Sequence, residues 1–99
     1  MSEEILSSHT AFVALGSNLG DREGNLRRAL ELLSQNGVEI VKISKFIETE
    51  PYGVIDQPRF LNGVCQVKTA LKPLELLHLL LAVETAMGRV RLRHWGERN

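Results

Sequence analysis

This sequence has a single cysteine, no apolar run long enough to span a bilayer, and no apolar signal-peptide segment near its start. A single thiol, Cys65, excludes an internal disulfide and a multi-cysteine metal site, and it suits a reducing compartment. The longest apolar stretch, residues 76–83, is interrupted by His78 and is too short to span a bilayer. The acidic start MSEEILSSHT lacks the apolar segment of a signal peptide. We therefore expect a cytoplasmic protein without a membrane partner.

Net charge is absent overall, because 12 basic residues balance 12 acidic ones, but the charge is unevenly spread. Residues 1–88 hold eight basic and eleven acidic groups, whereas residues 89–99 hold four basic groups and one acidic group. The overall balance argues against a general nucleic-acid coat protein, and the local excess of arginine predicts an anionic partner at this end. With 43% hydrophobic residues, the 99 residues suffice for one core, so we expect a single domain spanning 1–99.

Five elements are predicted. The continuous apolar run Ala11–Gly16 predicts a buried strand, and apolar residues at helical spacing predict a helix from Asp21 to Asn36. A β-rich segment, Val38–Ile47, has its alternation shifted by one position, which indicates a bulge or burial on both sides. A further strand is expected over Phe60–Thr69, and a helix from Pro73 to the residue before Gly88.

The order strand-helix-strand-strand-helix is that of an α+β ferredoxin-like sandwich without its last strand. We therefore expect an incomplete domain, truncated before that strand. An unpaired strand edge seeks partners, so self-association through an open sheet edge is expected. In the second helix, Leu74, Leu77, Leu81 and Glu84 recur at helical spacing and are expected to form a core-facing stripe.

The segment GSNLGD, which follows the first strand, has two interpretations. Its glycines can let backbone N–H groups approach an anion, or they can form a tight strand-to-helix turn. A Walker lysine–serine pair and a spaced glycine triplet are both absent from the sequence, so this segment alone does not define a site.

A proline-restrained loop, TEPYGVIDQPRFLN, runs from Thr49 to Asn62 and offers flat faces at Tyr52 and Phe60. Phe60 and Asn62 are two apart on a predicted strand, so they project to the same side. An aromatic face beside a carboxamide suits a planar heterocycle, because the ring stacks and the amide supplies a donor and an acceptor. A core aromatic with a capping asparagine explains the same pattern equally well.

The remaining candidates lie in the last third of the chain. Glu84, on an apolar stripe, needs a partner, either a ligand hydroxyl or an arginine of the C-terminal end. Arginine forks beside an indole suit a triphosphate and an aromatic ring, or single-stranded RNA, or they belong to a solvated basic tail. The residues concerned are Arg89, Arg91, Arg93, His94, Trp95 and Arg98.

Four segments taken together resemble a known family. ALGSNLGDREGNLRRAL, ETEPYG, DQPRFLNGV and GRVRLRHWGER, in this order and spacing, resemble the 6-hydroxymethyl-7,8-dihydropterin pyrophosphokinases of folate biosynthesis, from about Ala11 to the last residue. The resemblance implies a ferredoxin-like fold with additional C-terminal elements. It also implies transfer of a pyrophosphoryl group from ATP to the hydroxymethyl group of a reduced pterin, with release of AMP.

Residue by residue, the resemblance implies two sets of contacts. Pterin contacts would be Thr49, Tyr52, Phe60, Asn62 and Trp95. Nucleotide contacts would be Glu84, Arg91, His94, Trp95 and Arg98, with Arg91 and Arg98 also acting in catalysis.

Several positions depart from the family pattern. His94 stands where the family has arginine, and a neutral imidazole does not replace a permanent guanidinium on a polyphosphate. Glu50 and Glu97 stand where prolines are usual, and Leu81 stands where some members have a polar nucleotide contact.

The family also has an Asp-x-Asp pair that holds two magnesium ions. This sequence has no such pair, since its two aspartates are Asp21 and Asp56. Magnesium neutralises charge and aligns oxygens in phosphoryl-type transfer. The resemblance therefore implies Mg²⁺ as cofactor with no metal ligand in this chain, and impaired turnover.

Two alternatives remain beside this enzyme hypothesis. A small RNA-binding domain would use the arginines and exposed aromatics, but the sequence has no aromatic-rich ribonucleoprotein motif and residues 1–88 are acidic. An inert ligand-binding or assembly module would bind a pterin or nucleotide without chemistry. The enzyme hypothesis predicts ATP and a reduced pterin as partners and no nucleic acid.

Overall fold

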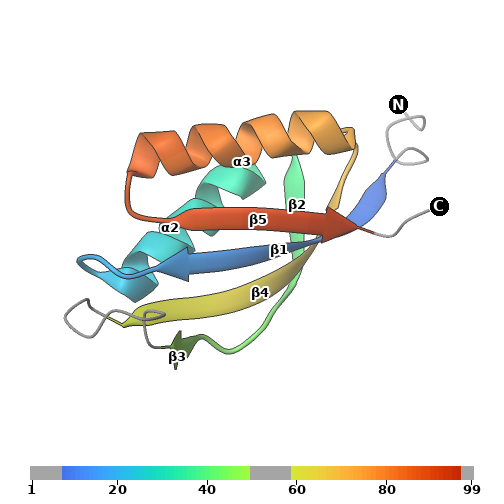
Figure 1. Cartoon of the computed structure of the whole chain (residues 1–99). Helices are drawn as coiled ribbons and strands as arrows, with labels where there is room; N and C mark the ends of the chain where they lie inside the picture. Colours follow the sequence, from blue (N-terminus) through green and yellow to red (C-terminus); the bar gives the residue numbers. More distant parts are fainter. Residues whose placement is uncertain (1–7, 50–58, 97–99) are drawn as a thin grey trace.

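One antiparallel sheet carries the whole architecture. The computed structural model describes residues 8–49 and 59–96, the last two by their backbone alone. Along the chain the elements are β1 (His9–Ser17), α2 (Arg22–Gln35), β2 (Val38–Ile43), β3 (Ile47–Thr49), β4 (Phe60–Thr69), α3 (Pro73–Met87) and β5 (Arg91–Gly96). The strands lie in the order β2-β4-β1-β5, and β3 pairs with the start of β4 (Figure 1). The predicted ferredoxin-like sandwich is confirmed.

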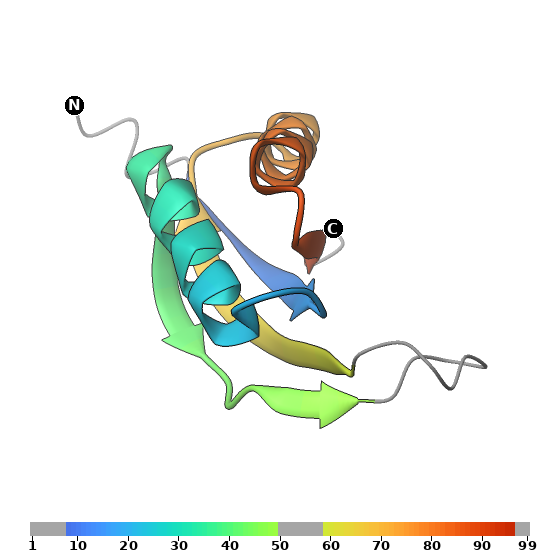
Figure 2. The same ribbon diagram turned by 90° about the vertical axis from the view of Figure 1, so that its left-hand side faces the viewer.

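Both helices cover the same face of the sheet (Figures 1 and 2). Strand residues of one parity point into this layer, so Val13 and Leu15 of β1 and Val67 of β4 are buried. The helices bury one side each, at Leu26, Ala29, Leu30 and Leu33 of α2 and at Leu76, Leu80 and Val83 of α3. No helix in the described part of the chain covers the opposite face. We call it the open face.

The expectation that the last strand of the sandwich is missing is wrong, because the described residues include that strand as β5. β5 pairs antiparallel with β1 from Gly16↔Arg91 to Ala11↔Gly96. Val90 and Leu92 are buried while Arg91 and Arg93 stay exposed, because alternate residues of the strand face opposite sides. The edge of β1 is therefore paired. The outer strands of the sheet are β5 on one side and β2 and β3, which both pair with β4, on the other.

The stripe expected on the second helix is also wrong. Leu74, Leu77 and Leu81 are 63%, 40% and 48% exposed, whereas Leu76 and Leu80 are buried. Leucines follow one another almost without interruption in α3, so helical spacing alone does not choose the inward side. None of the helices in the described residues is long and apolar enough to cross a membrane.

The β-rich segment predicted over Val38–Ile47 is not one continuous strand: β2 ends at Ile43, and β3 begins at Ile47. The register of β2 against β4 shifts between Ile40 and Lys42, which confirms a bulge. After it, Phe46 packs over Gly63 of β4, where an added Cβ would lie 2.6 Å from the Phe46 ring. This contact brings the short strand β3 alongside the start of β4.

Candidate functional site

Three predicted residues meet on the open face, where β3 and β4 begin to pair. Thr49 lies opposite Phe60 and Ile47 lies opposite Asn62, so Thr49, Phe60 and Asn62 come together. The Asn62 side-chain amide donates a hydrogen bond of 2.6 Å to the Thr49 hydroxyl. That bond uses one of the two amide donors and fixes the orientation of the carboxamide.

Gly16 of β1 makes room for this group. A Cβ at Gly16 would lie 3.0 Å from Asn62 Oδ1 and 3.8 Å from the Phe60 ring. Any larger residue would push against an amide that is already bonded to Thr49. The sequence placed Gly16 in a turn motif, but its distance from Asn62 in the chain gave no sign of this close approach.

A positive charge borders the aromatic ring. The Arg91 guanidinium lies over Phe60, with its carbon 5.7 Å from the ring centroid, within cation–π range. Beside them is a cavity of about 200 Å³ between the β1–α2 turn and the start of β5. It is lined by Gly16, Ser17, Asn18, Leu19, Phe60, Gly88, Arg89, Val90 and Arg91. A flat face and two arginines thus open onto the same space.

The GSNLGD segment forms a closed turn. The buried Ser17 hydroxyl donates to the Arg89 carbonyl at 2.6 Å, and the Asn25 amide donates to the Leu19 carbonyl at 2.8 Å. Asp21 caps α2 by accepting from the Gly24 N–H. Of the two interpretations, the tight turn describes these contacts. The positive charge beside the turn comes from Arg89, whose guanidinium lies 2.8 Å from the Cβ position of Gly20.

Other predicted residues lie outside this group or outside the described part. His94 alternates with Arg93, so it lies on the opposite face of β5 from Arg91, half-buried across from Val13. Glu84 accepts a hydrogen bond from the Leu92 N–H, a partner that the sequence did not indicate. Trp95 pairs with Phe12 in register. Tyr52, Arg98 and the side chain of Trp95 fall outside the described residues.

An ion-pair group adjoins the site and was missed by sequence reasoning. Arg22 donates one hydrogen bond to the Glu48 carboxylate and another, of 2.8 Å, to the Arg59 carbonyl. The hydrogen bond from Arg22, with its charge, holds the pKa of the Glu48 carboxyl below its ordinary value. These contacts join residues 26 and 37 positions apart, for which spacing gives no warning.

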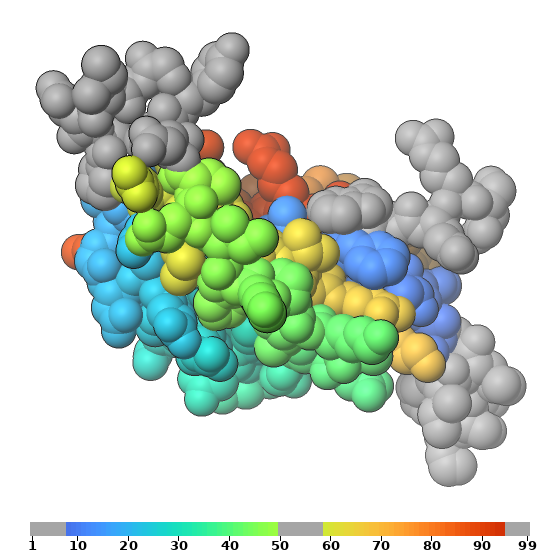
Figure 3. Space-filling view, turned by 90° about the horizontal axis from the view of Figure 1, so that it is seen from below, coloured from blue at the N-terminus to red at the C-terminus, as the bar shows by residue number. Residues whose placement is uncertain are grey.

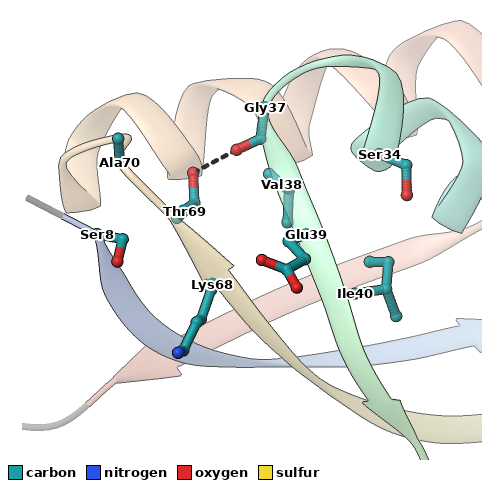
Figure 4. A pocket seen from close by; sticks show the side chains of 9 residues that line it. All are labelled: Ser8, Ser34, Gly37, Val38, Glu39, Ile40, Lys68, Thr69 and Ala70. Atoms are coloured by element: carbon teal, nitrogen blue, oxygen red, sulfur yellow. Dashed lines mark hydrogen bonds between the residues drawn. The ribbon is translucent and has the colours of Figure 1, made fainter. Parts of the chain in front are cut away.

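A second, larger cavity lies at the far end of β4 (Figure 4). Its volume is about 710 Å³, and it is lined by Ser8, Ser34, Gly37, Val38, Glu39, Ile40, Lys68, Thr69 and Ala70. The Thr69 hydroxyl is bonded to the Gly37 carbonyl at 2.8 Å, and Lys68 pairs with Glu39 across the strands. No predicted site residue lines this cavity, so the smaller one remains the candidate site.

The described residues do not fit a magnesium ion. No cluster of three or more His, Cys, Asp or Glu side chains occurs among them.

The described residues form a ferredoxin-like domain in which an aromatic ring, Phe60, and two arginines, Arg89 and Arg91, line one cavity. A model of the 7,8-dihydro-6-hydroxymethylpterin-pyrophosphokinase family matches residues 12–99. The chain belongs to this family.

Curated relatives agree with the family. The chain is 47% identical over 92 residues to the 2-amino-4-hydroxy-6-hydroxymethyldihydropteridine pyrophosphokinase of Bacillus subtilis, covering 92% of this chain and 55% of the relative. It is 46% identical over 90 residues to the protein of the same name from Haemophilus influenzae, covering 90% of this chain and 56% of the relative. The chain thus spans about half the length of these curated relatives.

Solved structures agree on the fold alone. A 30S ribosomal protein S6 from Thermotoga maritima matches with a TM-score of 0.65 at 10% identity, covering 90% of this chain and 88% of that one. An ACT domain protein from Streptococcus pneumoniae matches with a TM-score of 0.58 at 15% identity, covering 89% of each chain.

Proposed function

We propose that this chain forms the pterin-binding half, and part of the nucleotide-binding half, of a cytoplasmic pterin pyrophosphokinase in folate biosynthesis. In the reaction, the hydroxymethyl oxygen of the reduced pterin forms a bond to the β-phosphorus of ATP. The bond from that phosphorus to the bridging oxygen of the α-phosphate breaks, AMP leaves with the electron pair, and the hydroxyl proton is released. ATP and 6-hydroxymethyl-7,8-dihydropterin are the substrates.

One observation supports this proposal most strongly: Thr49, Phe60, Asn62 and Arg91 converge on one side of the sheet. Phe60 supplies a stacking face and Asn62 a fixed donor and acceptor for the edge of a pterin ring. Arg91 and Arg89, which line the same cavity, supply permanent positive charge for phosphate oxygens. The proposed ring-binding residues and the proposed anion-binding residues are therefore neighbours, which suits the two substrates.

The remaining site roles form part of the same proposal. Tyr52 and Trp95 contact the pterin, and Glu84, His94, Trp95 and Arg98 contact the nucleotide. Arg91 and Arg98 stabilise the charge that develops on the transferred group. Mg²⁺ is the metal cofactor. These 99 residues contain no Asp-x-Asp pair, so we expect them to bind substrates and to turn over very slowly by themselves.

The test is pterin-dependent release of AMP from ATP and Mg²⁺ by two proteins. One is this chain alone, and the other is this chain joined to the part of the Bacillus subtilis relative that lies beyond the matched region. We expect AMP from the joined protein, and on the order of 10³-fold less or none from the chain alone.

Replacing Asn62 by Ala in the joined protein should remove most of the pterin dependence, whereas Gln66→Ala serves as the matched control. Gln66 is a half-buried carboxamide on the same face of β4, four residues further along. A joined protein that folds, binds ATP and releases no AMP would contradict the enzyme proposal and favour the inert binding module.

A further inference from the structure

We propose that Arg22 is a positioning residue for the candidate pterin site, because it ties together the two strands that carry Thr49, Phe60 and Asn62. The inference rests on the proposed function of those three residues. It concerns a side chain that lies in another layer of the molecule and does not itself form part of the ring-binding group.

Arg22 is held in place by the start of its own helix. It is the first residue of α2, directly after Asp21, whose carboxylate accepts the Gly24 N–H at 3.1 Å. Seen from the side of β3, the green end of that strand lies against the light-blue start of α2 (Figure 3). The guanidinium therefore extends from a fixed helical turn toward the strand pair.

Its two nitrogens contact the two strands separately. Nη2 donates to Oε2 of Glu48 on β3, and Nη1 donates to the carbonyl of Arg59, the residue before β4, at 2.8 Å. The Arg59 guanidinium lies 3.6 Å from the other Glu48 oxygen, so two cations face one carboxylate. A planar fork with fixed N–H directions suits this double contact, and a lysine ammonium does not reproduce it.

Each contact is one residue from the site. Glu48 precedes Thr49, Arg59 precedes Phe60, and Thr49 pairs with Phe60 in the ladder. A strand as short as β3 is weakly held by its ladder alone, and all three of its residues are exposed. Phe46 fixes the entry to β3 by packing over Gly63. Arg22 fixes the other end, next to the Thr49–Asn62 hydrogen bond.

The Arg22–Glu48 pair is partly open to solvent. The side chains of Arg22 and Glu48 are 29% and 44% exposed, so each keeps partial access to water. An ion pair of this kind contributes modestly to stability. Its loss should therefore loosen the local geometry of the site without unfolding the domain.

The test compares Arg22→Gln, Arg22→Lys and Glu48→Gln with the parent chain. Binding of 6-hydroxymethylpterin and of ATP is measured separately. We expect Arg22→Gln to weaken pterin binding about threefold to tenfold and to leave ATP binding unchanged. Arg22→Lys should recover only part of the loss. The double variant Arg22→Gln/Glu48→Gln should lose less pterin affinity than the sum of the two single variants, because both changes remove the same Arg22–Glu48 contact.

Arg28→Gln is the matched control, since Arg28 is exposed on the same helix and the charge change is identical. The side-chain amide resonances of Asn62 provide a readout that needs no ligand: Arg22→Gln should shift them and Arg28→Gln should not. Unchanged pterin binding and unchanged Asn62 resonances in Arg22→Gln would overturn the inference. Equal losses of pterin and ATP binding would also overturn it, because they would indicate general destabilisation.

The same measurements distinguish a failure of the proposed pterin function from a failure of the Arg22 inference. If the parent chain binds no pterin while Arg22→Gln still shifts the Asn62 resonances, the pterin assignment fails and the positioning of Asn62 by Arg22 is supported.

Discussion

Gly16 shows how much of the candidate site depends on a single absent side chain. Asn62 Oδ1 lies 3.0 Å from the position that a Cβ would take, and the amide nitrogen of Asn62 is bonded to Thr49. The carboxamide therefore has little freedom to move aside. A residue larger than glycine at this position would press against that carboxamide.

Cys65 belongs to a reactive residue type, but its buried position makes its thiol unreactive. It is 1% exposed in the core, and burial raises the pKa of its thiol to about 11, from an ordinary value of 9.0. The neutral form is therefore favoured by folding. The stability that the buried neutral thiol of Cys65 contributes is therefore fully present below pH 9.0 and is lost as the pH rises toward about 11.

We predict that Cys65 reacts slowly with a disulfide reagent at pH 8. The folded chain should be labelled on the order of 100-fold more slowly than the chain in denaturant, because its thiolate fraction is lower. Stopped-flow absorbance with and without urea measures both rates. Rapid labelling under native conditions, equal to the rate in urea, would show that Cys65 is exposed.

Among the helices and strands, the sequence predicted correctly those features that depend on the spacing of neighbouring residues. The strand Phe60–Thr69 and the helix starting at Pro73 have the predicted bounds, and Phe60 and Asn62 share one face as expected. Proline at a helix start and alternation along a strand are local signals. The bulge in β2 also followed from a shift in that alternation.

What the sequence did not reveal depends on contacts between distant elements. The inward side of α3 was misassigned because leucine occupies nearly every face of the helix. β5 was missed although Arg91, Leu92 and Arg93 alternate, since only Val90 and Leu92 mark its buried side. No local pattern in the sequence predicts the hydrogen bonds of Arg22 to Glu48 of β3 and to Arg59, the residue before β4.

A hydrogen bond between Glu84 of α3 and Leu92 of β5 is expected to stabilise the fold. Glu84 accepts the Leu92 N–H, and Gly88 ends the helix in the left-handed conformation with φ of 70°. Replacing Glu84 by Ala should lower the free energy of unfolding by about 1–3 kcal/mol, because a part-buried N–H loses its acceptor. Glu84→Gln, which keeps an oxygen acceptor, should cost less. Urea unfolding measures both.

Glu31→Ala is the control for Glu84→Ala, because Glu31 is an exposed glutamate of the other helix. If the two alanine variants agree within about 0.5 kcal/mol, the Glu84–Leu92 contact does not stabilise the fold. A loss of nucleotide binding in Glu84→Gln, with stability kept, would support the proposed contact of this carboxylate with the nucleotide.

For the whole molecule, the two faces of the sheet have separate roles. One face is closed by both helices and contains the core, and the open face carries the candidate site (Figure 2). β5 on one side of the sheet, and β2 and β3 on the other, leave their outer edges unpaired within the described residues. Self-association through an open sheet edge therefore stays a prediction, now directed at these strands rather than at β1.

The central claim is that a pterin binds at the open face around Gly16, and an NMR titration with 6-hydroxymethylpterin tests it most directly. We predict the largest shifts at the backbone amides of Gly16 and Arg91 and at the side-chain amide of Asn62. The signals of Gly37 and Thr69, at the larger cavity, should not move. Shifts confined to Gly37 and Thr69, or no shifts at millimolar pterin, would contradict the account.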